Sequence, residues 1–293
     1  GAPTLLVYGH HDVQQPGRPE KWVTPAFEPA ERDGRLYGRG AVDDKGTFIT
    51  HVAAARAWLE TAGRLPLNLK LLIEGEEEIG SPGLEAFLKR YGRLLAADAV
   101  VLADTGNFDV GHPALTYQLR GICQVDVEVR CLEQPVHSGF WGGPVPDAVR
   151  ILARLLADLE RPDGSLNIPG LYRSVARTRP RQLRRIRALP FEVAKFRRSA
   201  AMKPGTRLVG EKAYSVWERL WTRPALTVVA LEAHPIPGSS NQIVDSARAR
   251  LSLRTVPDMD GWKAGALLVK KLTAKPPAGA KVTARVTGAS RWW

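Results

Sequence analysis

The sequence predicts a chain of two parts: an α/β domain with a mainly parallel sheet and flanking helices, and an α+β domain of ferredoxin-like type. Two observations lead to this fold class. Residues 1 to about 110 alternate β-prone apolar runs with helix-like segments, which is typical of a parallel sheet with crossover helices. From about residue 114 the order becomes strand, helix, two strands, helix, strand, which is the ferredoxin-like order. We place the domains at residues 1–112 and 113–290.

The elements of the first domain follow from local patterns. Short β-prone runs at 4–8 and 35–38 are separated by a loop rich in proline and glycine. Apolar residues repeat with a helical period between 45 and 60, at Phe48, Val52, Ala55 and Leu59, and predict a helix there. Strands are expected at 67–73 and 98–103, with a helix at 84–91 between them.

The second domain begins with a long β-prone segment at 115–130, followed by a glycine-rich stretch at 137–143. A helix is expected at 147–159. After a strongly basic segment we expect strands at 225–231 and 247–255, a helix at 262–272 and a strand at 281–287.

Length and composition exclude several classes of protein. The chain has 293 residues, enough for about two domains, and its 44% hydrophobic and 25% charged residues are ordinary for a globular protein. No run approaches the ~20 apolar residues of a membrane span, and no signal peptide opens the chain. Only Cys123 and Cys131 are present, which excludes a disulfide framework and favours a reducing, cytoplasmic location. The chain lacks an initiator Met, so we expect a piece of a longer protein whose first domain is incomplete.

The net charge of +12 is concentrated in one insertion. Residues 173–207 contain twelve Lys or Arg and one acid, Glu192, so this segment carries +11. Such a segment can bind nucleic acid or another polyanion. It has no regularly interleaved aromatic residues and no accompanying nucleic-acid fold signature, so a solvated Arg-rich helix pair is the favoured interpretation.

Histidine and acidic residues follow the predicted strands of the first domain. His10 and Asp12 follow the first strand, a run of three glutamates follows the strand at 67–73, and Asp104 follows the strand at 98–103. Because carboxyl ends of parallel strands meet at one edge of a sheet, these groups should lie together. Imidazole with several carboxylates is a ligand set for zinc, manganese or cobalt. The pattern predicts a hydrolytic metal site.

Local context suggests a role for some of these groups. His10 and Asp12 point to the same side if the strand continues, so His10 would bind metal and Asp12 would orient a ligand or a catalytic carboxylate. Two cations about 3.5–4 Å apart need a bridging carboxylate. Asp43 follows a Gly-Arg-Gly turn and suits that task, whereas Asp44 could instead cap the next helix.

The run Glu76–Glu78 would be a solvated loop in isolation. Directly after an apolar strand, its like charges would repel unless a cation or a shared proton relieves them. One glutamate as a metal ligand and its neighbour as general base to a metal-bound water is an economical use of the pair.

Three motifs resemble one enzyme family: Tyr-Gly-His-His-Asp-Val-Gln from residue 8, Tyr-Gly-Arg-Gly-Ala-Val-Asp-Asp-Lys-Gly from 37, and Glu-Gly-Glu-Glu-Glu-Ile-Gly-Ser from 74. Their order and spacing are similar to those of the co-catalytic metallopeptidases related to carboxypeptidase G, aminoacylase and carnosine dipeptidase, most closely the cytosolic nonspecific dipeptidase branch. The resemblance implies a catalytic α/β domain and a lid or dimerisation domain. It also implies two divalent metal ions, hydrolysis of dipeptides or small N-acyl amino acids, and a homodimer formed through the lid.

The resemblance also implies roles residue by residue. One metal would be held by His10, Asp43 and Asp104, and the other by Asp43 and Glu78. Glu77 would be the general base, and Asp12 would orient a metal ligand or the catalytic carboxylate without binding metal itself. His137 would be the lid histidine that reaches the active site of a neighbouring subunit. Arg254 and Asn241 would bind the substrate.

Some family features are missing. The family's last metal-binding histidine lies in a C-terminal segment, and neither His51, His112 nor His234 has that context. Val244 replaces a usual proline, and residues 232–239 lack the usual glycine-rich run. A competing hypothesis is therefore an inactive or truncated metal-binding scaffold. A third is an anion- or nucleic-acid-binding role of the basic segment.

Overall fold

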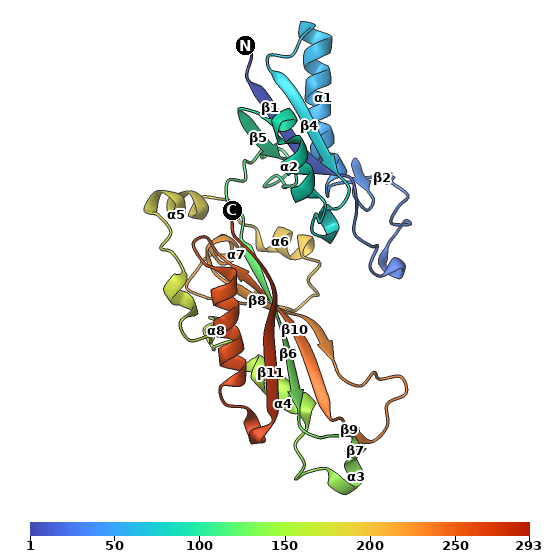
Figure 1. Cartoon of the computed structure of the whole chain (residues 1–293), viewed down its shortest axis with the longest axis vertical. Helices are drawn as coiled ribbons and strands as arrows, with labels where there is room; N and C mark the ends of the chain where they lie inside the picture. The colour runs from blue at the N-terminus through green and yellow to red at the C-terminus, as the bar shows by residue number, and fades with distance from the viewer. The chain divides into compact units, whose positions relative to one another are not determined.

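The computed structural model describes all residues from Gly1 to Trp293. The chain folds as two compact units, unit 1 (residues 1–116) and unit 2 (residues 117–293) (Figure 1). None of the helices combines the length and the hydrophobicity that a membrane span requires.

Unit 1 is built on a parallel sheet of three strands in the order β4-β1-β5. The strands are β1 (Thr4–His10), β4 (Asn68–Glu74) and β5 (Ala99–Leu102). The apolar run of β1 lies in the middle, where Val7 is fully buried. The predicted parallel sheet is confirmed, and its register places the carboxyl end of β1 beside the carboxyl end of β4.

Two helices and a small hairpin complete unit 1. The helices are α1 (Lys45–Ala62) and α2 (Leu84–Leu95), and the hairpin pairs β2 (Ala30–Arg32) with β3 (Arg35–Tyr37). Short 3₁₀ turns lie at Pro19–Lys21 (η1) and Glu77–Ile79 (η2). α1 ends where Gly63 adopts a left-handed conformation, a common helix stop. Much of the predicted apolar stripe of α1 is exposed within this unit, including Val52 and Leu59.

Unit 2 contains an antiparallel sheet of four strands in the order β11-β6-β10-β8. The strands are β6 (Gly121–Arg130), β8 (Ala225–Glu232), β10 (Ser246–Thr255) and β11 (Lys281–Ser290). α4 (Ala148–Ala157) and α8 (Gly261–Thr273) pack against the sheet. Alternate residues of β6 are buried in this core, and residues between them lie on the other, open face.

The strand predicted at 115–130 begins only at Gly121, so the prediction was wrong for residues 115–120. Their apolar side chains suggest a strand, but β6 gains its partners β10 and β11 only from Gly121 onward. Leu119 instead exchanges two main-chain hydrogen bonds with Trp293, at 2.7 and 3.2 Å.

The segment between α4 and β8 contains η3 (Leu171–Ser174) and three helices, α5 (Pro180–Arg187), α6 (Val193–Ser199) and α7 (Val216–Thr222). α5 and α6 are the pair of Arg-rich helices expected in the basic segment. Sequence reasoning did not predict α7, whose N-terminus is defined by a capping box between Ser215 and Glu218. The remaining elements are β7 (Val136–His137), α3 (Ser138–Trp141), β9 (Gln242–Ile243) and η4 (Pro277–Gly279).

Candidate metal centre

His10 is the last residue of β1, and its side chain is fully buried. Its Nδ1 lies 3.0 Å from the main-chain carbonyl of Asp12, which can only accept a hydrogen bond. Nδ1 therefore carries a proton, and a neutral ring has a free lone pair on Nε2. This is the tautomer that a metal-binding imidazole uses when a carbonyl orients it from behind.

Three carboxylates surround the Nε2 atom of His10. Oδ1 of Asp43 is 3.1 Å away, and Oε2 of Glu77 and Oδ2 of Asp104 are each 3.9 Å away. These groups come from the turn before α1, from η2 after β4, and from the loop after β5. The parallel sheet thus collects them at one edge, as the strand-end pattern predicts.

The charges at this edge are poorly balanced by the protein alone. Burial raises the pKa of the Glu77 carboxyl, and Asp104 and Glu78 raise it further while His10 opposes them. Burial and the neighbouring Asp43 likewise raise the pKa of Asp104. The cluster therefore favours an added positive charge.

The donor set fits a divalent cation. One ligand atom each from His10, Asp43 and Asp104 lie within 4.8 Å of one another, and one nitrogen with two carboxylate oxygens suits zinc and similar ions. Burial lowers the pKa of His10, but its bond to the carbonyl of Asp12 and the surrounding carboxylates outweigh burial and raise it, so in the protein alone the ring's own proton balances part of this negative charge. A divalent cation at Nε2 would take the place of that proton and bind the carboxylate oxygens as well. Oδ1 of the buried carboxylate of Asp44 also has no hydrogen-bond partner.

Asp44 occupies the position before α1, but its side chain does not cap that helix. Its Oδ2 instead accepts a hydrogen bond of 3.1 Å from the main-chain nitrogen of His10. The prediction that Asp44 could cap the helix was therefore wrong. The fold places the end of β1 against the Asp44 carboxylate, and at this buried position leaving the main-chain nitrogen of His10 without a hydrogen bond would cost more free energy than leaving the helix end uncapped by this side chain. Through this hydrogen bond, Asp44 fixes the turn that contains Asp43 against the strand that contains His10.

Asp12 lies behind the cluster and organises the glutamate loop. Its Oδ2 accepts a hydrogen bond of 3.0 Å from the main-chain nitrogen of Glu78. Burial alone would raise the pKa of Asp12, but backbone hydrogen bonds, that from Glu78 foremost, outweigh burial and lower it. Asp12 is thus held as a carboxylate that orients its neighbours.

Glu78 lies outside the three-residue group around His10. Its side chain is held by Gln14, whose Nε2 donates to Oε2 of Glu78 at 2.7 Å and to the main-chain carbonyl of the same residue at 3.2 Å. Sequence reasoning included Gln14 in a motif but assigned it no role. The signal was its place two residues after Asp12, which puts both side chains on the same side if the strand direction continues past His10.

A second set of contacts that the sequence did not reveal secures the other end of this loop. The hydroxyl groups of Tyr8 and Ser81 both donate to Oε1 of Glu74, the latter at 3.0 Å. Oε2 of Glu76 accepts from the main-chain nitrogen of Gly83 at 2.9 Å. These bonds fix the segment that presents Glu77 and Glu78.

The remaining predicted site residues belong to unit 2. His137, at the end of β7, accepts a hydrogen bond of 3.1 Å on Nδ1 from the main-chain nitrogen of Gly139. Asn241 lies next to it, since its main-chain carbonyl accepts from the nitrogen and the hydroxyl of Ser138 at 2.8 and 3.0 Å. Arg254 is exposed near the far end of β10 and is not brought together with His137.

The sequence of this chain is similar to those of known proteins. The sequence profile described as "Peptidase family M20/M25/M40" matches residues 6–275. Cysteinylglycine-S-conjugate dipeptidase of Corynebacterium striatum is 35% identical over 288 residues, which are 98% of this chain and 61% of that protein. Human Beta-Ala-His dipeptidase is 32% identical over 88% of this chain and 51% of its own length.

Solved structures show the same similarity. Human carnosine dipeptidase 1 aligns with a TM-score of 0.82 and 30% identity, over 100% of this chain and 62% of that one. An M20 family metallo-carboxypeptidase of Sulfolobus solfataricus aligns with a TM-score of 0.77 and 29% identity, over 99% and 65%. The chain thus spans about three fifths of the length of these relatives.

Proposed function

Because the chain belongs to peptidase family M20/M25/M40, we propose that this protein is a metal-dependent dipeptidase that hydrolyses the amide bond of dipeptides or small N-acyl amino acids. The observation that carries the proposal is the convergence of His10, Asp43, Asp104 and Glu77 at one edge of the parallel sheet. Relatives named as dipeptidases for cysteinylglycine S-conjugates and for Beta-Ala-His support the substrate class.

We assign two divalent cations, zinc first and manganese or cobalt as alternatives. His10, Asp43 and Asp104 would hold one, and Asp43 and Glu78 would contribute to the other. Bound there, the cations would supply Lewis acidity that lowers the pKa of water and polarises the scissile carbonyl.

Glu77 is the proposed general base. Its Oε2 lies 3.9 Å from Nε2 of His10, but Glu77 is not part of the group of His10, Asp43 and Asp104 whose ligand atoms lie within 4.8 Å of one another. Its raised pKa suits a group that takes a proton and later returns it. In this role Glu77 removes a proton from the attacking water and delivers it to the leaving amine. Asp12 keeps the adjoining main chain in place through its bond to Glu78.

His137 is proposed to donate a hydrogen bond to the developing oxyanion. Because its Nδ1 accepts from Gly139, a neutral ring carries its proton on Nε2, which is then free to donate. In this proposal His137 acts in the site of a neighbouring subunit, within a homodimer formed through unit 2, a ferredoxin-like lid. Arg254 would bind the terminal carboxylate of the substrate, and Asn241, beside His137, would line the site.

The proposal is tested with Glu77→Gln in the protein, using cysteinylglycine and β-alanyl-histidine as substrates. Turnover should fall by about 100-fold or more, because general base catalysis is worth that much, while the bound metal measured by elemental analysis stays the same. Glu85→Gln, an exposed glutamate on α2, is the matched control and should leave turnover intact. Full turnover in Glu77→Gln would remove this residue from the mechanism.

A metal-binding scaffold without catalysis is the alternative. It would be supported if the wild-type protein binds metal at His10, Asp43 and Asp104 but hydrolyses neither dipeptide.

Since both free thiols, Cys123 and Cys131, remain unpaired, a cytoplasmic location remains our prediction.

A further inference from the structure

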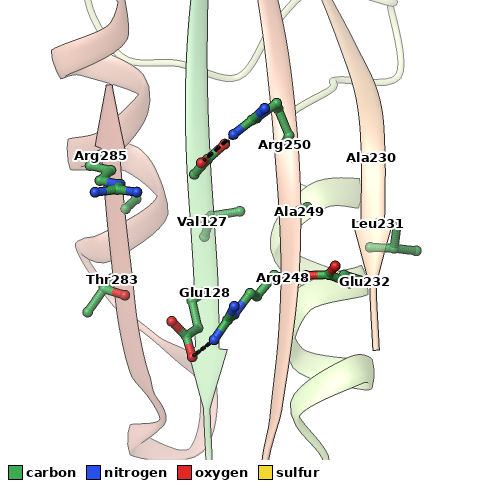
Figure 2. Close-up of a pocket in the computed structure, with 12 residues that line it drawn as sticks. Val127, Glu128, Ala230, Leu231, Glu232, Arg248, Ala249, Arg250, Thr283 and Arg285 are labelled. Carbon is green, nitrogen blue, oxygen red and sulfur yellow. Dashed lines mark hydrogen bonds and ion pairs between the residues drawn. The ribbon is translucent and has the colours of Figure 1, made fainter. Parts of the chain in front are cut away.

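The open face of the sheet in unit 2 carries arginines whose charges are balanced at one end. Arg250 donates two hydrogen bonds to Asp126, at 2.7 and 2.9 Å, and Arg248 lies 3.5 Å from Glu128 (Figure 2). Arg285 projects from β11 (Figure 2), and the register of β11 and β6 pairs it with Asp126. At this end the sheet itself provides carboxylates for its cations.

At the opposite end of the same face, two arginines, Arg120 and Arg254, have no carboxylate partner within unit 2. Arg254 is paired in register with Ile122, and Arg120 lies two residues before Ile122, hence on the same side of the chain. The antiparallel register therefore makes Arg120 and Arg254 diagonal neighbours. Within unit 2 neither guanidinium forms an ion pair or a side-chain hydrogen bond.

No acid on this part of the sheet compensates the two cations. The neighbouring residues of the open face are uncharged: Ala225, Thr227, Gln124, Ser252 and Ser290. Arg120 is half-buried, and burial, followed by the nearby charge of Arg254, lowers the pKa of its guanidinium. A desolvated cation beside a second cation is a costly arrangement that a bound anion relieves.

We infer that Arg120 and Arg254 together form the binding site for the substrate's terminal carboxylate, with Arg120 a second binding residue that the motifs do not reveal. This inference rests on the proposed function. A carboxylate has two oxygens with about four acceptor positions, and two guanidinium forks can occupy them together. Two such contacts would make the site select substrates with a free carboxylate over their amides.

Kinetics of Arg120→Ala and Arg120→Lys test the inference. For a dipeptide with a free carboxylate, Arg120→Ala should lower kcat/KM by about 10- to 100-fold, since a hydrogen bond to a charged group is worth that much. Arg120→Lys should lower kcat/KM by a smaller factor, because lysine keeps the positive charge but lacks the two parallel N–H donors of a guanidinium group. Arg285→Ala, on the same face, is the matched control and should leave kcat/KM unchanged.

A second measurement does not depend on turnover. Phenylglyoxal modifies accessible arginines, and peptide mapping by mass spectrometry reports each site. N-acetylglycine should protect Arg120 and Arg254 but not Arg285, whereas N-acetylglycinamide, which lacks the carboxylate, should protect none of them.

The outcomes separate this inference from the proposed function. Equal protection by the acid and the amide, or an unchanged kcat/KM in a folded Arg120→Ala protein, would overturn the role of Arg120 while hydrolysis by the wild type keeps the dipeptidase proposal intact. Absence of hydrolysis in the wild type, with carboxylate-specific protection of both arginines, would overturn the dipeptidase proposal and leave the anion site standing.

Discussion

Gln14 donates a hydrogen bond of 2.7 Å to Oε2 of Glu78 and another of 3.2 Å to the main-chain carbonyl of that residue. The two bonds fix both the carboxylate and the backbone of the glutamate that we assign to the second cation. Asp12 holds the main-chain nitrogen of the same residue. Glu78 lies in the loop after β4, but the two side chains that orient it, Asp12 and Gln14, lie in the loop after β1.

Gln14→Ala should weaken binding of the second cation by about 10-fold or more, because partners behind a metal ligand typically contribute that much to affinity. Binding of the first cation, at His10, should be unaffected. Titration with Co²⁺, followed by its visible absorption, measures both events. Gln15→Ala is the control, since the side chain of Gln15 takes no part in this network. Equal weakening of both binding events would show a general effect on the unit instead.

Asp104→Asn should weaken binding of the first cation, because it replaces one of the two carboxylates that we assign to this cation with a neutral amide. Equilibrium dialysis with zinc, followed by elemental analysis, measures the loss. His112→Asn is a suitable control, as the exposed ring of this histidine hydrogen-bonds to the carbonyl of Val110 and lies outside the cluster around His10. Unchanged zinc affinity in Asp104→Asn would exclude Asp104 as a ligand.

Glu218 should make a pH-dependent contribution to stability. Burial alone would raise the pKa of its carboxyl, but hydrogen bonds from Arg187 and Ser215 outweigh burial and hold the pKa below its ordinary value of 4.5. A depressed folded-state pKa stabilises the fold above pH 4.5, and this contribution disappears as the pH falls through the folded-state value. Urea unfolding of Glu218→Gln should therefore show a deficit at pH 7 that shrinks in acid.

A deficit that stays constant from pH 7 to acid pH would contradict this account of Glu218. Glu192→Gln is the control. Glu192 precedes α6 without a side-chain capping bond, and its replacement should change stability little at any pH.

Arg223 is expected to be a major stabilising residue of unit 2. Its guanidinium lies 4.8 and 4.3 Å from the ring centroids of Tyr172 and Tyr214, and it donates to both carboxylate oxygens of the buried Glu211. Arg223→Met would leave that carboxylate buried with the Tyr172 hydroxyl as a donor but without its charged partner, and loss of a charged partner typically costs about 3 to 5 kcal/mol. Chemical unfolding measures the change in free energy.

Arg248→Ala provides the comparison for Arg223, because Arg248 is an exposed arginine in a loose ion pair with Glu128. Its loss should change the free energy of unfolding by less than about 1 kcal/mol. Similar costs for the two variants would show that burial of the Arg223 pair is not what makes it important.

The first unit could be predicted well because its information is local. The apolar runs of β1 and β4 and the helical period of α1 are patterns within single segments, and the acidic groups follow the strands directly. Knowledge of how parallel strands align is then enough to bring His10 near Asp104. Boundaries were less predictable: α2 runs to Leu95, past the predicted 91, and residues 115–120 lack the strand partners that their composition suggests.

The sequence by itself determined the two kinds of sheet, the strand ends that carry histidine and carboxylates, and the family to which these motifs point. Only the tertiary structure decided that Asp44 binds the main chain of His10, that Gln14 and Asp12 hold Glu78, and that Arg120 lies beside Arg254. The physical reason is distance along the chain. Periodicity and motif spacing report neighbours within a segment, whereas hydrogen bonds and unbalanced charges depend on which distant segments the sheets place side by side.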